Sequence, residues 1–174
     1  MQPTSKPGLV HLYCGDGKGK TTAAMGLALR ALGAGHSVTI LQFLKDGSSA
    51  ELAPLRTLGA RVLAGQTGSR FVFQMTEAER AQTRQYQSKL LRTVLADPCD
   101  LLILDEACAA WQLDMVDRDL LQTAVLGRPA GREVVLTGRD PAPWMQQAAD
   151  SCPEMCARRP PSPRGVPARP GLEY

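Results

Sequence analysis

The chain has 174 residues, of which 44% are hydrophobic, and it carries a net charge of +3. That length and apolar content suffice for one domain with a buried core, and so small a charge does not indicate a nucleic-acid or membrane partner. The sequence has no run of about 18 or more apolar residues that could span a bilayer. The opening MQPTSKPG lacks the apolar core of a signal peptide. We therefore expect a soluble, cytoplasmic protein.

Five cysteines are present, without a CxxC pair and without histidines at zinc-finger spacing. They are Cys14, Cys99, Cys108, Cys152 and Cys156. An odd number in this arrangement favours free, reduced thiols over a zinc site or a disulfide framework.

Apolar periodicity divides most of the chain into alternating strands and helices. Strands are predicted at 8–14, 37–43, 60–64, 100–106 and 132–138. Helices are predicted at 21–32, 50–59 (interrupted by Pro54), 77–96, around the apolar residues Met115, Val116, Leu120, Leu121 and Val125, and near 142–149. Residues 65–75 fit neither period and are expected to form a loop. This alternation predicts an α/β fold with a mostly parallel sheet and helices on both faces.

Residues 153–174 differ from the rest in composition. They contain five prolines between Pro160 and Pro170 and four arginines between Arg158 and Arg169. Since so many prolines exclude a helix, we expect a strap that lies over a single domain comprising residues 1–174.

The most informative motif is CGDGKGKTT at 14–22, between a predicted strand and a predicted helix. A glycine-rich turn there lets backbone N–H groups converge beside the positive end of the helix dipole, which suits phosphate. Gly19, Lys20 and Thr21 match the end of the Walker A motif, in which lysine reaches the outer phosphates and the hydroxyl reaches Mg²⁺. Cys14 stands where the strict motif has its first glycine. The alternative is a flexible loop that binds no ligand.

A second candidate motif is LLILDE at 101–106, in which an apolar strand leads to Asp105 and Glu106. Carboxylates at the carboxyl end of a strand are placed as a Walker B motif requires, so that they can reach a metal ion. The alternative is that they only cap the next helix. Together with the phosphate loop they indicate a nucleotide and Mg²⁺, without indicating which bond is broken.

The sequence resembles the P-loop ATP:corrinoid adenosyltransferases almost from end to end. The resemblance is carried by GDGKGKTTAAMGLALRA at 15–31, QFLKDG at 42–47, GSRFVFQM at 68–75, LLILDEA at 101–107, LTGRDPAP at 136–143 and the closing GLEY. It implies a P-loop NTPase-like (RecA-like) fold and an enzyme that transfers the 5′-deoxyadenosyl group of ATP to cobalt(I) of a corrinoid in adenosylcobalamin biosynthesis or salvage. The whole triphosphate would leave. ATP would therefore be bound in the opposite orientation to ATP in most P-loop enzymes, with its 5′ carbon turned toward the corrinoid.

The resemblance also implies roles for individual residues. Lys20, Phe71, Phe73 and Glu106 would be catalytic, and Thr21 and Glu106 would ligate Mg²⁺ with Asp105 close by. ATP would be bound by Gly15, Asp16, Gly17, Lys18, Gly19, Lys20, Thr21, Thr22, Gln42, Lys45 and Arg139. The last three follow strand ends, where parallel sheets bind ligands, and could instead be solvated loop residues.

The two phenylalanines match family positions that contact the corrinoid. On an extended segment, alternate residues point to one side, so Phe71 and Phe73 could form an apolar wall that excludes water and the lower axial ligand from cobalt. Such a wall would ease the reduction of cobalt(II) to cobalt(I). The alternative is that both rings belong to the core. Trp111 and Trp144 are expected to pack rather than to bind ligand.

Two other functions remain open at this point. One is a nucleoside kinase of the thymidine-kinase type, which also combines a P-loop with a DEA strand end. The other is a non-catalytic carrier of corrinoid that is gated by ATP. The resemblance further implies a homodimer and a partner that donates an electron to cobalt.

Overall fold

The computed structural model describes residues 8–65, 72–159, 165 and 167–172. The described strands are β1 (Val10–Tyr13), β2 (Val38–Phe43), β3 (Arg61–Gly65), β4 (Leu101–Asp105) and β5 (Glu133–Thr137). The helices are α1 (Lys20–Gly33), α2 (Leu52–Thr57), α3 (Glu77–Ala96), α4 (Ala107–Gln112), α5 (Arg118–Leu126) and α6 (Pro143–Ala148), with a 3₁₀ turn, η1, at Val72–Gln74.

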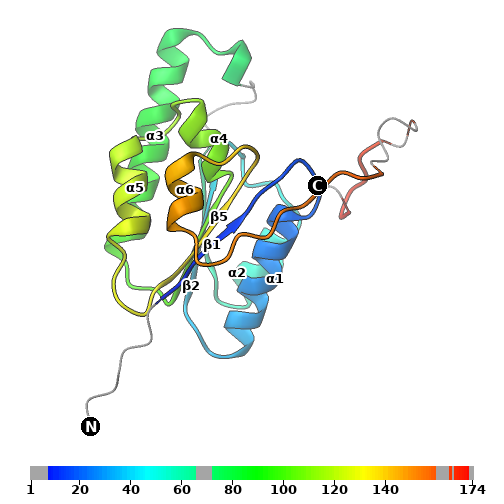
Figure 1. Cartoon of the computed structure of the whole chain (residues 1–174), viewed down its shortest axis with the longest axis vertical. Helices are drawn as coiled ribbons and strands as arrows, with labels where there is room; N and C mark the ends of the chain where they lie inside the picture. The colour runs from blue at the N-terminus through cyan, green and yellow to red at the C-terminus, as the bar shows by residue number, and fades with distance from the viewer. Residues whose placement is uncertain (1–7, 66–71, 160–164, 166, 173–174) are drawn as a thin grey trace.

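The strands form one parallel sheet in the order β1-β5-β4-β2-β3. Helices α3, α4, α5 and α6 cover one face, and α1 and α2 cover the other (Figure 1). Each face buries its own apolar cluster, and β4 is buried along its whole length. The predicted α/β fold with helices on both faces is therefore confirmed.

Local sequence explains where the clearest helix starts. The Thr76 side chain accepts from the N–H of Glu79, and the Glu79 carboxylate accepts from the N–H of Thr76 at 2.7 Å. This capping box satisfies two of the N–H groups that have no partner within α3. Pro54 lies in the first turn of the short α2, where its missing N–H costs little.

One predicted helix is wrong in its extent. Met115 and Val116 are buried, as their apolar pattern suggested, but they lie in the connection between α4 and α5. Asp114 adopts a left-handed conformation with φ 56°, and the Asp117 side chain accepts from the N–H of Leu120 at 3.1 Å. This cap begins a new helix after the break. Helix α4, which directly follows β4, was not predicted as a separate element.

The segment after α6 runs beside β1 as if it were a further strand. Ser151 bridges His11 and Glu154 bridges Cys14, both in parallel register. The N–H of Leu12 donates to Ser151 O at 2.8 Å, and the N–H of Met155 donates to Cys14 O at 2.8 Å. The edge of the sheet at β1 is thus covered, which protects it from pairing with another chain.

Two remaining predictions concern the tryptophans and membrane spans. Trp111 and Trp144 pack against each other with ring centroids 5.0 Å apart, next to the core. None of the described helices is long and apolar enough to cross a membrane.

Candidate functional site

The phosphate loop connects the end of β1 to the start of α1. Gly15 and Gly19 have φ values of 102° and 115°, a region that glycine enters without strain. Lys20 is the first residue of α1, and its Nζ donates to the carbonyl of Gly17 at 2.8 Å. The loop therefore forms a turn at a helix N-terminus, a position that suits anions, with the lysine side chain held against the loop backbone.

Asp105 is the centre of a buried polar network at the carboxyl end of β4. Its carboxylate is fully buried, and the register of the sheet places Gln42 of β2 beside it. Oδ1 accepts from the hydroxyls of Thr21 and Thr137 at 2.9 and 2.7 Å. Oδ2 accepts from Lys45 Nζ at 2.7 Å and from Gln42 Nε2 at 3.1 Å. The buried carboxylate thus has four hydrogen-bond donors, and it orients the groups that donate to it.

Glu106, the next residue, has a less common backbone conformation and a freer carboxylate. Its φ of 60° lies in the left-handed region, and its N–H donates to the Thr137 hydroxyl at 2.9 Å. The side chain is 31% exposed, with Lys45 Nζ 3.9 Å from Oε1. Burial raises the pKa of Glu106, and the nearby Lys45 opposes that shift. Strain of this kind in a ligand-binding loop commonly serves to aim a side chain.

Lys45 lies at the meeting point of the predicted metal ligands. Its Nζ is 2.7 Å from Asp105, 3.2 Å from the Thr21 hydroxyl and 3.9 Å from Glu106. The three oxygen-bearing side chains thus converge on one cation. Leu44, directly before it, has a φ of 57°, so the backbone here is held in a strained conformation.

The donor set at this point fits Mg²⁺. Mg²⁺ prefers oxygen ligands and is usually held by one or two carboxylates together with substrate phosphates and water. Thr21 and Glu106 can supply a hydroxyl and a carboxylate, while Asp105 is saturated with hydrogen bonds and orients Thr21. Among the described residues, there is no group of three or more His, Cys, Asp or Glu side chains that could hold a metal ion.

A cavity of about 800 Å³ opens over the phosphate loop. Predicted residues from Asp16 to Thr22 line it, together with Lys45, Glu106 and Arg139. The described part of its wall carries six basic side chains but only two acidic ones, Asp16 and Glu106. The basic ones are Lys18, Lys20, Lys45, Arg139, Arg158 and Arg159. This excess of positive charge matches a polyanion such as a nucleotide triphosphate.

Other predicted residues lie elsewhere. Gln42 and Asp105 are fully buried beneath the cavity, and Gly15 lines a neighbouring cavity that also includes Trp111 and Arg118. Phe73 belongs to η1 and is 81% exposed, so it is not a core residue, and it does not line the cavity over the loop. Phe71 lies outside the described residues.

The sequence did not single out two parts of this site. One is Thr137, which bonds both Asp105 and the backbone of Glu106. A hydroxyl at the end of a central strand, two residues before the predicted Arg139, was the available signal. The other is the segment Cys156–Arg159, which lines the cavity although its composition predicted only a strap.

Comparison with known proteins agrees with this geometry. Residues 6–174 match the family model described as ATP:corrinoid adenosyltransferase BtuR/CobO/CobP. The chain is 32% identical to a corrinoid adenosyltransferase of Pseudomonas aeruginosa, with 99% of this chain and 87% of the relative covered. It is 31% identical to corrinoid adenosyltransferase CobA of Salmonella typhimurium and 29% identical to that of Escherichia coli K12, in each case over 99% of this chain and 89% of the relative. The chain therefore belongs to the ATP:corrinoid adenosyltransferase family and is an enzyme that transfers the adenosyl group of ATP to a corrinoid.

Proposed function

We propose that the reaction is a nucleophilic substitution at the 5′ carbon of ATP, with the triphosphate bound over the phosphate loop as the leaving group. Cobalt(I) of the corrinoid forms the new bond to carbon, the bond from C5′ to the α-phosphate oxygen breaks, and triphosphate departs with its electron pair. The observation that carries this proposal is the cavity over residues 16–22, with six basic side chains against two acidic ones. Fixed positive charge of this kind stabilises the negative charge that develops on the leaving group.

In this proposal the loop residues divide the work. Lys20 leaves the carbonyl of Gly17 and reaches the phosphates, with Lys18 and Arg139 on the same cavity wall. Thr21 and Glu106 hold Mg²⁺, and Asp105 fixes Thr21 by accepting from its hydroxyl. When bound, Mg²⁺ supplies further charge stabilisation for the triphosphate.

In this proposal the corrinoid binds next to the aromatic segment that contains Phe71 and Phe73. Phe73 is an apolar ring with 81% of its surface exposed, on the turn that precedes α3. This exposure excludes a place in the core, and in this proposal the ring contacts the corrinoid. We propose that Phe71 and Phe73 together shield cobalt from water and from a lower axial ligand.

Further parts of the proposal concern the surroundings of the enzyme. A reductase would supply the electron that converts cobalt(II) to cobalt(I), the enzyme would work as a homodimer, and its location would be the cytoplasm. Sedimentation measurements test the dimer, and reconstitution with candidate reductases tests the electron donor.

The central test is adenosylation in solution. The protein is incubated with ATP, Mg²⁺ and chemically reduced cobalamin, and we expect the adenosylcobalamin spectrum to appear together with one triphosphate for each adenosyl group transferred. Lys20→Ala should lose turnover. Release of only phosphate or ADP would instead point to a kinase, and unchanged corrinoid affinity in Lys20→Ala without turnover in the parent protein would point to a carrier.

A further inference from the structure

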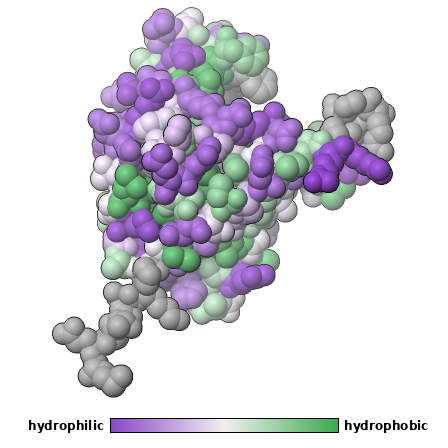
Figure 2. All heavy atoms as spheres, in the orientation of Figure 1, coloured by the Kyte–Doolittle hydropathy of each residue, from purple (hydrophilic) through white to green (hydrophobic). Residues whose placement is uncertain are grey.

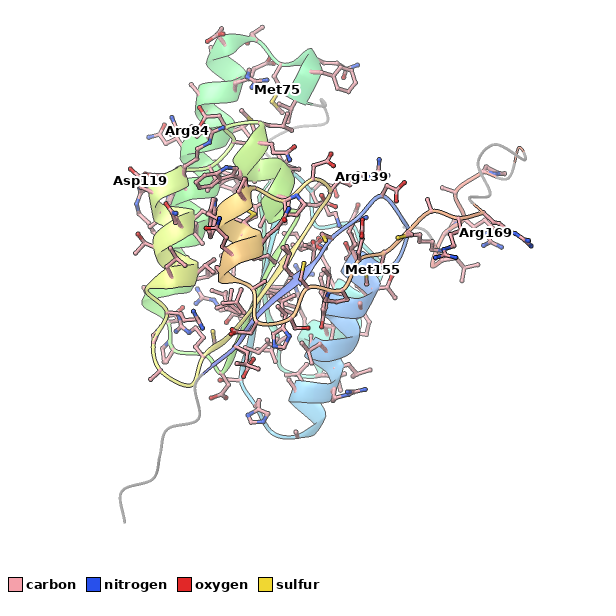
Figure 3. All side chains as sticks on the ribbon, in the orientation of Figure 1. Met75, Arg84, Asp119, Arg139, Met155 and Arg169 are labelled. Atoms are coloured by element: carbon pink, nitrogen blue, oxygen red, sulfur yellow. The ribbon has the colours of Figure 1, made fainter. Side chains whose placement is uncertain are left out.

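The segment after α6 is attached directly to the phosphate loop. Met155 O accepts from the N–H of Gly17 at 2.6 Å, and Met155 N donates back to Cys14 O at 2.8 Å. Two residues after Met155, the N–H of Ala157 donates to the Asp16 carboxylate at 3.2 Å. Figure 3 shows Met155 on this segment, beside the chain that leaves β1. The N–H of Gly17 therefore donates to the C-terminal segment rather than to a phosphate.

Two of the loop glycines leave no space for a side chain because of this segment. A Cβ on Gly15 would lie 2.4 Å from Met155 O, and a Cβ on Gly17 would lie 2.6 Å from the same atom. By contrast, a Cβ on Gly19 would meet nothing within 4 Å. Glycine at 15 and 17 thus allows the segment to pack closely against the loop, and this close packing fixes where the next residues lie.

Those next residues bring positive charge to the cavity. Cys156, Ala157, Arg158 and Arg159 all line it, and both arginines are exposed. No ion pair of either arginine is found within the part of the chain that the structure describes. Figure 2 shows strongly hydrophilic side chains where this segment leaves the body of the molecule. With no ion pair to another described residue, the two arginines share this wall with Lys18 and Lys20, and the combined charge favours a polyanion there.

We propose that residues 156–159 form a wall of the nucleotide site and that Arg158 and Arg159 bind the triphosphate of ATP and retain it after the bond to C5′ breaks. This inference rests on the proposed role of triphosphate as leaving group. A guanidinium can donate two parallel hydrogen bonds to phosphate oxygens, which suits it to a polyphosphate chain better than an ammonium. The arginines touch phosphates only, so they should contribute to the affinity for triphosphate and not to the affinity for adenosine.

The test measures binding of the full chain to inorganic triphosphate, to ATP with Mg²⁺ and to adenosine, by calorimetry at two salt concentrations. In the double variant Arg158→Gln with Arg159→Gln, we expect affinity for triphosphate and ATP to fall about tenfold or more, since charge-assisted hydrogen bonds are lost. The salt dependence should become shallower, and adenosine binding should not change. The charge-preserving variant Arg158→Lys with Arg159→Lys should recover part of the affinity. Arg56→Gln, an exposed arginine at the end of α2, is the control and should behave as the parent.

The outcomes separate this inference from the proposed function. If the glutamine variant binds triphosphate and ATP as tightly as the parent while the parent adenosylates cobalamin, the arginine wall is overturned and the function stands. A parent that produces no adenosylcobalamin overturns the function whatever the arginines do. Equal losses of affinity for adenosine and triphosphate would also overturn the arginine wall, because the arginines would then not act through the phosphates.

Discussion

Thr137 connects the two acidic residues of the site through a single buried hydroxyl. It donates to Asp105 at 2.7 Å and accepts from the N–H of Glu106 at 2.9 Å. Thr137→Val keeps the shape but leaves that N–H unpaired, so we expect a loss of about 2 kcal/mol in the free energy of unfolding and weaker Mg²⁺-dependent turnover. Thr137→Ser should restore both. Urea denaturation and the adenosylation assay check this, and equal behaviour of the valine and serine variants would refute the role of the hydroxyl.

Lys45 supplies the counter-charge of the buried Asp105, from which it is 2.7 Å away. Its Nζ also lies close to the Thr21 hydroxyl and Glu106, so Lys45 and Mg²⁺ would compete for the same oxygens. Lys45→Met should lower the free energy of unfolding by about 2 kcal/mol in EDTA, because a buried carboxylate loses its partner. Added Mg²⁺ should recover part of that loss and bind more tightly than to the parent. Melting temperatures with and without Mg²⁺ test this, and a loss that Mg²⁺ does not reduce would contradict it.

We expect the ionised carboxylate of Glu106 to lower the free energy of unfolding while it supports Mg²⁺-dependent activity. Burial raises its pKa above the ordinary value of 4.5, so the folded state binds this proton more tightly than the unfolded chain does. Ionisation therefore costs no stability well below 4.5, where the carboxyl is protonated in both states, and the cost grows as the pH rises above 4.5 and is complete above the raised pKa. Glu106→Gln should be more stable than the parent at pH 8, equal to it well below pH 4.5, and inactive with Mg²⁺. Urea denaturation at both pH values measures this difference, and a variant less stable at pH 8 would contradict the sign.

At the scale of elements, the sequence predicted best where local pattern and fold agree. The alternation of apolar strands with amphipathic helices located all five described strands, and α3 has the predicted bounds 77–96. The break between α4 and α5 was missed because Met115 and Val116 are buried at helical spacing without being helical. Apolar spacing reports burial, whereas the left-handed Asp114 and the Asp117 cap decide where a helix ends and begins.

Only the parts of the candidate site that belong to short contiguous motifs could be predicted from the sequence. The phosphate loop and the DE pair are contiguous in sequence, so their geometry follows from one strand end and one helix start. The pairing of residues 151–155 with β1 joins segments about 140 residues apart and leaves no periodic signal. The proline-rich composition excluded a helix but could not indicate that Met155 contacts Gly17.

The contact between Gly17 and Met155 leads to a prediction about the phosphate loop and the C-terminal segment. Gly17→Ala would place a Cβ 2.6 Å from Met155 O, which the backbone can relieve only by moving the segment. We expect a loss of about 1–3 kcal/mol in the free energy of unfolding and faster tryptic cleavage after Arg158, since the bond after Arg159 precedes Pro160 and resists trypsin. Gly26→Ala, inside α1 with nothing within 4 Å of the new Cβ, is the control and should stabilise by about 0.5–1 kcal/mol. Identical cleavage rates in the two variants would show that the segment does not depend on Gly17.

At the scale of the whole molecule, the first strand and the segment after the last helix meet at the phosphate loop. The first strand delivers the loop, and the segment after the last helix pairs with that strand and lines the cavity. Cys14 and Cys152 belong to these two parts, and their Sγ atoms are 3.9 Å apart. Although the sequence predicted only free thiols, this distance allows a disulfide to form with little movement.

An added disulfide oxidant such as oxidised glutathione should therefore link Cys14 to Cys152. Each thiol gives up its hydrogen, and the oxidant is reduced to two thiols. Burial raises the pKa of Cys14 to about 11, so the reaction should begin at the exposed Cys152 and proceed slowly at neutral pH. The bond would join positions 138 apart in sequence and should raise the free energy of unfolding by about 2–4 kcal/mol, because it restricts the unfolded chain.

Mass spectrometry of tryptic peptides and thermal denaturation before and after oxidation measure this. Cys152→Ser should abolish both the linkage and the gain in stability, whereas Cys156→Ser, which alters a neighbouring exposed thiol on the same segment, should leave both in place. Linkage of Cys152 to Cys156 instead would mean that the segment leaves the loop often enough for its own thiols to meet first. In that case the wall of the cavity would be open for much of the time, and the close packing of Met155 on Gly17 would not limit access to the nucleotide site.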